Sequence, residues 1–177
     1  LQRSKHWNFD SSSLVPSTGA GTLTVNTGVA ETYVTGNPVA GKALSSNSWD
    51  AGDNLQVAVN TVSYEDMILS FDEEASATGP TSFKIQYSSD GLTYTDLASS
   101  TTSTSLSPTF TSHTFSLASI TATDNNANTR LRIVPSGATN VAGVLHIDNL
   151  LVSGATSSTP SEITSCSTTG NTGDLRI

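Results

Sequence analysis

The sequence predicts an all-β protein, a two-sheet antiparallel jelly-roll sandwich. The first reason is composition: 56 of the 177 residues are Ser or Thr and only 12% are charged, so strand and turn formers outnumber helix formers. The second is a series of about ten or eleven short segments that alternate between apolar and polar residues and are separated by turn residues. The third is that the first and last segments are both apolar, as a closed sandwich requires.

The first part of the chain predicts short strands joined by loops. A strand is expected near residues 5–10, followed by a loop with Pro and Gly, and a cleanly alternating strand at 21–25. Two further short strands are expected at 31–35 and 42–46. Residues 49–54 then form a loop that carries two acids.

The middle of the chain predicts longer strands. Alternation places them at 55–59, 65–73, 82–88 and 92–97. The last two flank the Ser89-Asp90-Gly91 turn, and Asp-Gly between alternating runs is the strongest short-range hairpin signal because Gly supplies positive φ.

The last part of the chain holds the clearest strand, residues 144–154. A bent strand at 109–116 and a regular one at 130–134 precede it. Strict alternation in 144–154 would place Leu145, Ile147, Asn149 and Leu151 on one face and Val144, His146, Asp148, Leu150 and Val152 on the other. The predicted domain is therefore 1–154, and 155–177 is a Ser/Thr-rich flexible tail or linker.

Asp148 and the residues at the other end of the chain predict a metal site. A carboxylate inside an apolar strand costs several kcal/mol unless a cation or hydrogen-bond donors meet it. If the terminal strands pair, Asp10, Asn8, Asp148 and Asn149 offer oxygen ligands of the kind that calcium prefers. The alternative is that Asp10 caps a turn while Asp148 accepts hydrogen bonds.

Three short motifs carry a family resemblance. They are Trp7-Asn-Phe-Asp10, Phe83-Lys-Ile-Gln-Tyr-Ser-Ser-Asp-Gly91 and His146-Ile-Asp-Asn-Leu150. Over about residues 5–154 the chain resembles the jelly-roll domains of secreted bacterial proteins in the galactose-binding-like and MAM-like group. The resemblance implies a module appended to a larger extracellular protein, with a structural calcium ion held by acids of the first and last strands, here Asp10 and Asp148.

The loop around Trp49 is the predicted ligand-binding site. Trp49 stands beside Asp50 and near Asp53, and sugars are recognised by an aromatic platform together with acid and amide groups. Tyr33, Tyr64 and Tyr94 are weaker platform candidates. The alternative for each aromatic residue is filling of the core. Asp50 and Asp53 with Asn54 are a second metal candidate without regular calcium-loop spacing, and Asp72-Glu73-Glu74 is expected to be a solvated strand end.

Charge and motif content argue against several classes of function. With Lys plus Arg 7 and Asp plus Glu 15, the net charge is −8, which argues against nucleic acid and anionic membrane surfaces as partners. No apolar run is long enough to insert in a membrane. No His pair has zinc-site spacing and no Gly-x-Ser-x-Gly motif occurs, so we expect no catalytic residues. The single cysteine, Cys166, cannot form an internal disulfide.

The sequence thus predicts a non-catalytic binding or attachment module, extracellular or at a cell surface. The expected partner is a glycan or a surface or matrix protein, and calcium is the expected ion. The alternative is a structural subunit of a surface layer, filament or matrix that self-associates through exposed strand edges.

Overall fold

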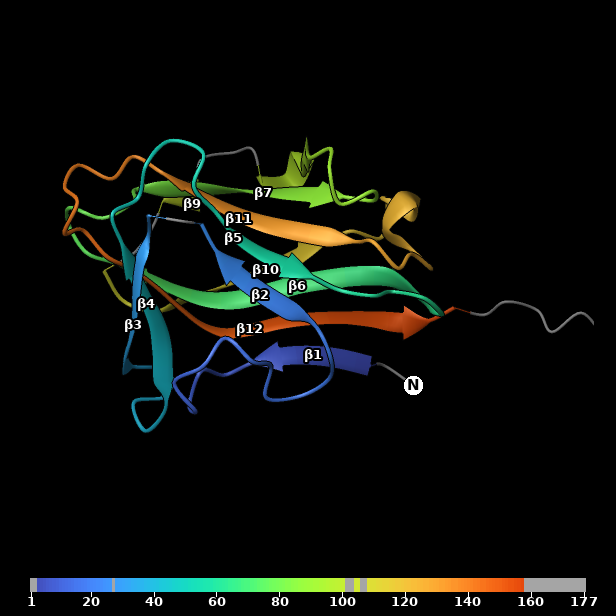
Figure 1. The fold of residues 1–177 in the computed structure, drawn as a ribbon, viewed down its shortest axis with the longest axis horizontal. Helices are drawn as coiled ribbons and strands as arrows, with labels where there is room; N and C mark the ends of the chain where they lie inside the picture. The colour runs from blue at the N-terminus through green and yellow to red at the C-terminus, as the bar shows by residue number, and fades with distance from the viewer. Residues whose placement is uncertain (1–2, 27, 101–103, 106–107, 158–177) are drawn as a thin grey trace, which may run out of the picture.

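The computed structural model describes residues 3–26, 28–100, 104–105 and 108–157. In it, two six-stranded antiparallel sheets face each other as a sandwich (Figure 1). The all-β jelly-roll prediction is confirmed. In the described residues, helical structure is limited to two single 3-10 turns, η1 (Ala98–Ser100) and η2 (Thr121–Thr123).

The first sheet, sheet A, contains both terminal strands. Its order is β10 (Thr111–Ser116), β6 (Tyr64–Ala75), β12 (Leu145–Thr156), β4 (Lys42–Asn47) and β3 (Ala30–Thr35), with β1 (Arg3–Trp7) also paired to β12. In the β1–β12 pair, Arg3 lies opposite Gly154 and Trp7 opposite Leu150. The expected pairing of the first and last strands is therefore correct.

The second sheet, sheet B, is the layer that Figure 1 shows above sheet A. Its order is β2 (Thr22–Val25), β5 (Leu55–Ala58), β11 (Arg130–Ser136), β7 (Ser82–Ser88) and β8 (Thr95–Asp96), with β9 (Thr104–Ser105) also paired to β7. The expected hairpin after β7 is real but short, because only Gln86 and Tyr87 pair with β8.

The inward faces of both sheets form one apolar core. In β5, for example, Leu55 and Val57 are buried and alternate with partly buried neighbours, as expected of a half-buried strand. Phe71 and Phe83, from opposite sheets, meet edge to face with ring centroids 5.4 Å apart. Trp7 and Phe9 are also buried in this core.

The strict alternation expected in the last strand is wrong. Leu145 and Ile147 face the core, but so do Leu150 and Val152, because the pairing with β6 shifts register between Asp148 and Leu151. A β-bulge adds a residue and reverses which side chains face inward. Asn149 sits in this bulge with φ 48°, a conformation that Asn tolerates better than most residues.

The expectation of a solvated acidic strand end at residues 72–74 is also wrong. Strand β6 continues to Ala75, and Asp72 and Glu73 are buried. The His113 Nε2 atom lies 3.2 Å from Glu73 Oε1 inside the sandwich. The acids are buried because β10 and β12 flank β6 on both sides.

Within the described ranges, no helix is long and apolar enough to cross a membrane. Residues 158–177, which include Cys166 and most of the expected tail, lie outside the described residues. Strand β12 runs to Thr156, two residues past the expected domain end.

Candidate functional site

The four predicted metal ligands come together at one cavity. Asn8, Asp10, Asp148 and Asn149 all line a hollow of about 270 Å³, together with Asn37 and other residues of the loop between β3 and β4. We call this hollow the acidic cradle. The pairing of β1 with β12 places the two chain ends beside each other, as the sequence predicts.

Hydrogen bonds hold both carboxylates of the acidic cradle. Asp148 accepts the backbone N–H of Asn37 at 2.7 Å on Oδ2 and that of Asn149 at 2.7 Å on Oδ1. Asp10 accepts the backbone N–H of Lys42 at 2.9 Å and the Asn8 side-chain amide at 2.8 Å. The backbone N–H groups of Asn37 and Lys42 thus bind carboxylates that are distant from them in the sequence.

The charges in and around the cradle repel one another. Burial raises the pKa of Asp148 above its ordinary value, and the nearby Asp10 and Asp72 carboxylates raise it further, against the opposing hydrogen bonds. No Lys or Arg is among the described residues that line the cradle, and the Lys42 ammonium instead donates to Ser12 Oγ at 2.7 Å.

The backbone is shaped to make the cradle narrow. Phe9 has φ 55°, unusual for a bulky residue, and the turn buries Phe9 while Asp10 is exposed. A Cβ on Gly36 would lie 2.4 Å from Asp148 Oδ2, and one on Gly41 would lie 2.7 Å from Asp10 Oδ1. Glycine is required here for the close approach of backbone and carboxylate.

The cradle has the donor types that fit calcium, although carboxylates alone would not suffice. In the described part of the chain, no group of three or more His, Cys, Asp or Glu side chains is arranged to hold a metal ion. A calcium site would therefore combine the two carboxylates with amide and carbonyl oxygens, which calcium accepts. Two features fit such a site. No Lys or Arg among the lining residues balances the charge of the two carboxylates, and the backbone at Gly36 and Gly41 approaches them too closely to admit a Cβ.

The Trp49 loop does not present an open aromatic platform. Trp49 is 8% exposed, belongs to the core, and donates its indole N–H to the Ser46 carbonyl at 3.1 Å. Asp53 accepts the Asp50 N–H at 2.8 Å and the Asn26 amide at 3.1 Å, and so organises its own turn. Trp49 thus fills part of the core, and with Asp50 it also lines a hollow of about 270 Å³. Ligand binding by Trp49, Asp50 and Asp53 stays a prediction.

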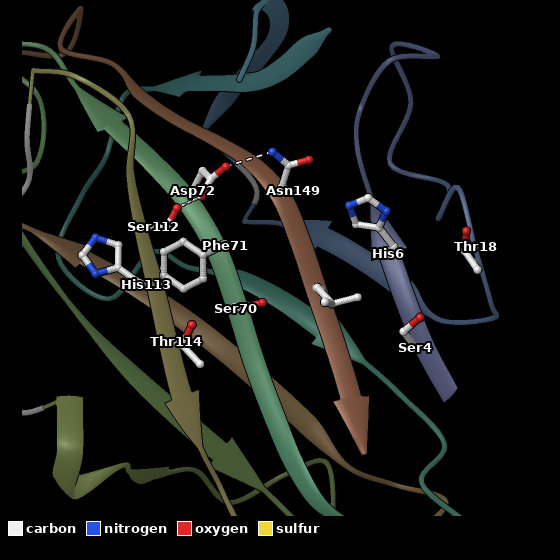
Figure 2. A pocket seen from close by; sticks show the side chains of 11 residues that line it. Ser4, His6, Thr18, Ser70, Phe71, Asp72, Ser112, His113, Thr114 and Asn149 are labelled. Carbon is white, nitrogen blue, oxygen red and sulfur yellow. Dashed lines mark hydrogen bonds between the residues drawn. The ribbon is translucent and has the colours of Figure 1, made fainter. Parts of the chain in front are cut away.

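Sheet A carries a polar groove on its outer face. The groove has a volume of about 370 Å³ and crosses β10, β6, β12 and β1. Figure 2 shows Asp72 at its upper end between Ser112 and Asn149. Asp72 accepts the Asn149 amide at 2.8 Å, the Asn37 amide at 3.1 Å and the Ser112 hydroxyl. The groove is thus lined mainly by small hydroxyls and an acid whose hydrogen bonds are already made within the protein.

The outer face of sheet B carries a different arrangement, a row of polar side chains at right angles to the strands. Strand pairing places Gln56 opposite Arg132, Arg132 opposite Gln86, and Gln86 opposite Asp96. The residues between them along the strands, such as Leu131 and Ile85, are buried, so these four side chains share the outer face.

Tyr94 lies flat on this row. The Arg132 guanidinium carbon is 3.3 Å from the centre of the Tyr94 ring, the contact distance of two stacked planes. The Tyr94 hydroxyl donates to Gln56 Oε1 at 2.6 Å, and Arg132 Nε donates to the same oxygen at 3.0 Å. Arg132 covers one face of the Tyr94 ring, and Tyr94 as a whole is only partly buried.

The turn after β7 holds Tyr94 in place. Asp90 accepts the backbone N–H groups of Leu92 and Thr93 at 2.8 and 2.7 Å and the Ser88 hydroxyl at 2.9 Å. These hydrogen bonds lower the pKa of Asp90 far below its usual range. The turn that the Asp-Gly signal predicts therefore does two things: it reverses the chain direction, and it positions the Tyr94 ring.

A hollow of about 490 Å³ adjoins the row. It is lined by Lys84, Gln86 and Asp96, by Val134 and Ser136 of β11, and by the loop at Gly52. Asp96 is held by Lys84 at 3.0 Å and by the Gln86 amide at 2.7 Å. We call the row, Tyr94 and this hollow the sheet B face.

Comparisons with known proteins agree on the fold. No protein-family model and no curated protein matches the sequence. The CBM22-1 xylan-binding domain from Paenibacillus barcinonensis Xyn10C has a TM-score of 0.58 at 10% identity, covering 88% of this chain and 94% of that domain.

Family 29 carbohydrate-binding modules are also similar. One has a TM-score of 0.54 at 16% identity over 86% of this chain and 89% of its own. A variant of a family 29 module, complexed with mannohexaose, has a TM-score of 0.52 at 17% identity over 86% of this chain and 91% of its own. At these identities the similarity is one of fold, and it confirms the jelly-roll sandwich.

Sequence reasoning missed most of the sheet B face. Tyr94 was a secondary candidate, while Gln56, Arg132 and Gln86 were not singled out. These three residues lie on three different strands, and they are aligned only because β5, β11, β7 and β8 are neighbours in sheet B. The available signal was their position between buried residues on strands, which marks an outward-facing side chain.

Proposed function

We propose that this protein is a non-catalytic carbohydrate-binding module and that its glycan site is the sheet B face. The observation that carries the proposal is the Tyr94 ring, stacked on Arg132 and anchored through its hydroxyl to Gln56. A ring held this way loses little freedom on binding, which favours affinity. Similarity in fold to modules described as xylan-binding or complexed with mannohexaose supports the same class.

The polar row fits the other requirement of sugar recognition. Gln56, Arg132, Gln86 and Asp96 present amide, guanidinium and carboxylate groups beside one ring. Sugar hydroxyls both donate and accept hydrogen bonds, so a mixed row of this kind can hold them. The row crosses several strands, which suits an extended chain better than a single sugar.

We further propose that calcium is a structural ion bound in the acidic cradle. Asp10 and Asp148 would hold it, with oxygens from Asn8, Asn149 and the loop at Asn37. The ion would neutralise repelling carboxylates and tie β1, β12 and the β3–β4 loop together. An extracellular or cell-surface location is part of the proposal, because such modules and millimolar calcium occur there.

The test is affinity electrophoresis in a panel of soluble neutral and acidic polysaccharides, followed by calorimetry on any that retard the protein. We expect Tyr94→Ala to lose about fivefold or more in affinity, since stacking on an aromatic ring contributes roughly 1 kcal/mol or more. Leu92→Ala is the matched control, because Leu92 belongs to the same turn and is 84% exposed. Binding that survives Tyr94→Ala unchanged would refute this location for the site.

A further inference from the structure

We infer that the glycan bound at the sheet B face is anionic and carries carboxylates, as a uronic-acid polysaccharide does. The inference rests on the proposed function and specifies its ligand. It starts from the distribution of charge. The chain has 7 Lys and Arg residues and a net charge of −8, yet Lys84, Arg130 and Arg132 lie on this one face.

The two arginines have no carboxylate partner among the described residues. The ion pairs there are Lys84 with Asp96 and two His–Glu contacts. Arg130 bonds through Nη1 to its own neighbour, the Thr129 carbonyl, at 3.1 Å. Two guanidinium charges thus remain uncompensated on a half-buried face of an acidic protein.

The position of each arginine suits a carboxylate. Arg130 and Arg132 are two residues apart on β11, so both point outward. Arg130 lies close to Gly91 of the turn, and Arg132 lies beneath Tyr94. The described hydrogen bonds of Arg132 use Nε alone, so its terminal nitrogens can bind both oxygens of a carboxylate.

The acid on this face does not cancel that charge. Asp96 is already paired with Lys84 at 3.0 Å and with the Gln86 amide. The acids of the cradle lie elsewhere, because Asp148 is on β12 of sheet A and Asp10 is in the turn that follows β1 of the same sheet. Asp90 of the adjoining turn directs Oδ1 to the Leu92 and Thr93 N–H groups and the Ser88 hydroxyl. Arg130 and Arg132 are therefore the described cations of this face that have no ion-pair partner.

The experiment compares two forms of one polymer, polygalacturonate and its methyl ester. They share a backbone, and only the first carries carboxylates. Calorimetry of the full chain in 0.05 M and 0.5 M NaCl should show tighter binding of polygalacturonate, with the difference shrinking at high salt. Dextran sulfate serves as a test of simple charge attraction.

Three variants separate the causes. Arg130→Gln should weaken polygalacturonate binding about tenfold or more and leave the ester unaffected. Arg132→Lys keeps the charge but loses the planar fork, so it should also weaken the acidic polymer. Lys5→Gln removes an equal charge from β1, where Lys5 donates to the Asn60 carbonyl, and should leave polygalacturonate affinity unchanged. Melting curves establish that each variant is folded.

Each other outcome counts against the inference. Equal, salt-independent binding of both polymers would overturn it and leave the proposed glycan site standing. Dextran sulfate binding as tightly, with Lys5→Gln as harmful as Arg130→Gln, would reduce it to non-specific charge attraction. If no neutral or acidic glycan binds, the inference and the proposed function both fail.

Discussion

At the residue scale, Asp148 is the side chain whose environment has the clearest consequence. It is 2% exposed and its pKa is raised from 3.8 by burial and by Asp10 and Asp72. The folded protein then binds this proton more tightly than the unfolded chain does. Without a metal ion, the contribution of Asp148 to stability is therefore greatest at low pH and falls as pH rises through the raised pKa.

Calcium should reverse this dependence, because it binds the ionised carboxylates. We predict that chelator-treated protein loses unfolding free energy as pH rises from the ordinary Asp pKa through the raised one. Calcium at 100 times its dissociation constant should add about 2.7 kcal/mol near neutral pH. Melts in calcium and in chelator across this pH range provide the measurement.

The matched variants for this prediction are Asp148→Asn and Glu31→Gln. Asp148→Asn should abolish the calcium-dependent gain. Glu31 lies on β3 and is exposed, so its neutral variant should keep the gain. A calcium effect retained in Asp148→Asn would place the ion elsewhere.

Gly36 provides a steric test of the same cradle. Its added Cβ would lie 2.4 Å from Asp148 Oδ2 and 2.6 Å from the Lys42 carbonyl carbon. We predict that Gly36→Ala lowers unfolding free energy by about 1–3 kcal/mol, the usual cost of overpacking, in denaturant titrations.

Gly28→Ala separates collision from backbone strain. Gly28 has φ +103° with nothing within 4 Å of an added Cβ, so the variant is strained without touching the cradle. It should therefore leave the calcium response intact, whereas Gly36→Ala should weaken it. Equal loss of calcium response in both would contradict a close-packed cradle.

At the scale of elements, the turn between β7 and β8 links stability to binding. Strand β8 is only two residues long. The hydrogen bonds from the Leu92 and Thr93 N–H groups to Asp90 therefore help to fix the backbone that leads to Tyr94. Because the pKa of Asp90 is lowered in the folded state, this contribution is present above the unfolded pKa and is lost as pH falls through the folded one.

We predict that Asp90→Ala weakens glycan binding several-fold and also lowers the melting temperature, because the turn loses the acceptor of the Leu92 and Thr93 N–H groups. Ser89→Ala is the control: its neighbour Ser88, rather than Ser89, donates to Asp90. Calorimetry and thermal melts on the same samples check both parts. A large loss of stability without loss of binding would mean that the turn serves the fold rather than the site.

At the scale of the whole molecule, the two sheets differ in charge and in chemistry. Sheet A carries the acidic cradle and a groove of small hydroxyls with a satisfied acid. Sheet B carries the stacked tyrosine and the arginines. A binding module needs only the second face to be free, whereas a structural subunit would join copies through strand edges such as β3 and β10.

This difference predicts the oligomeric state. We expect light scattering on a sizing column to give a mass near 18.3 kDa both with millimolar calcium and with chelator. Multiples of that mass, especially with calcium, would support the alternative of a self-associating surface or matrix subunit.

Local pattern was enough to predict the fold and the meeting of Asn8, Asp10, Asp148 and Asn149 at one hollow. Alternation identified most strands, because the period of a half-buried strand is a property of neighbouring residues. The apolar first and last segments predicted that β1 and β12 pair, and Asp148 inside such a segment pointed to the acidic cradle at their junction. These inferences needed only a few residues at a time.

The bulge at Asn149 and the burial of Glu73 depend on neighbouring strands that lie far away in the chain. So does the burial of Trp49, which packs in the core that both sheets form. The sheet B face has the same origin: Gln56, Arg132, Gln86 and Asp96 come from four strands, and Tyr94 reaches them by folding over the sheet. Register between distant strands is set by the packing of the whole core, so their alignment appears only in the folded molecule.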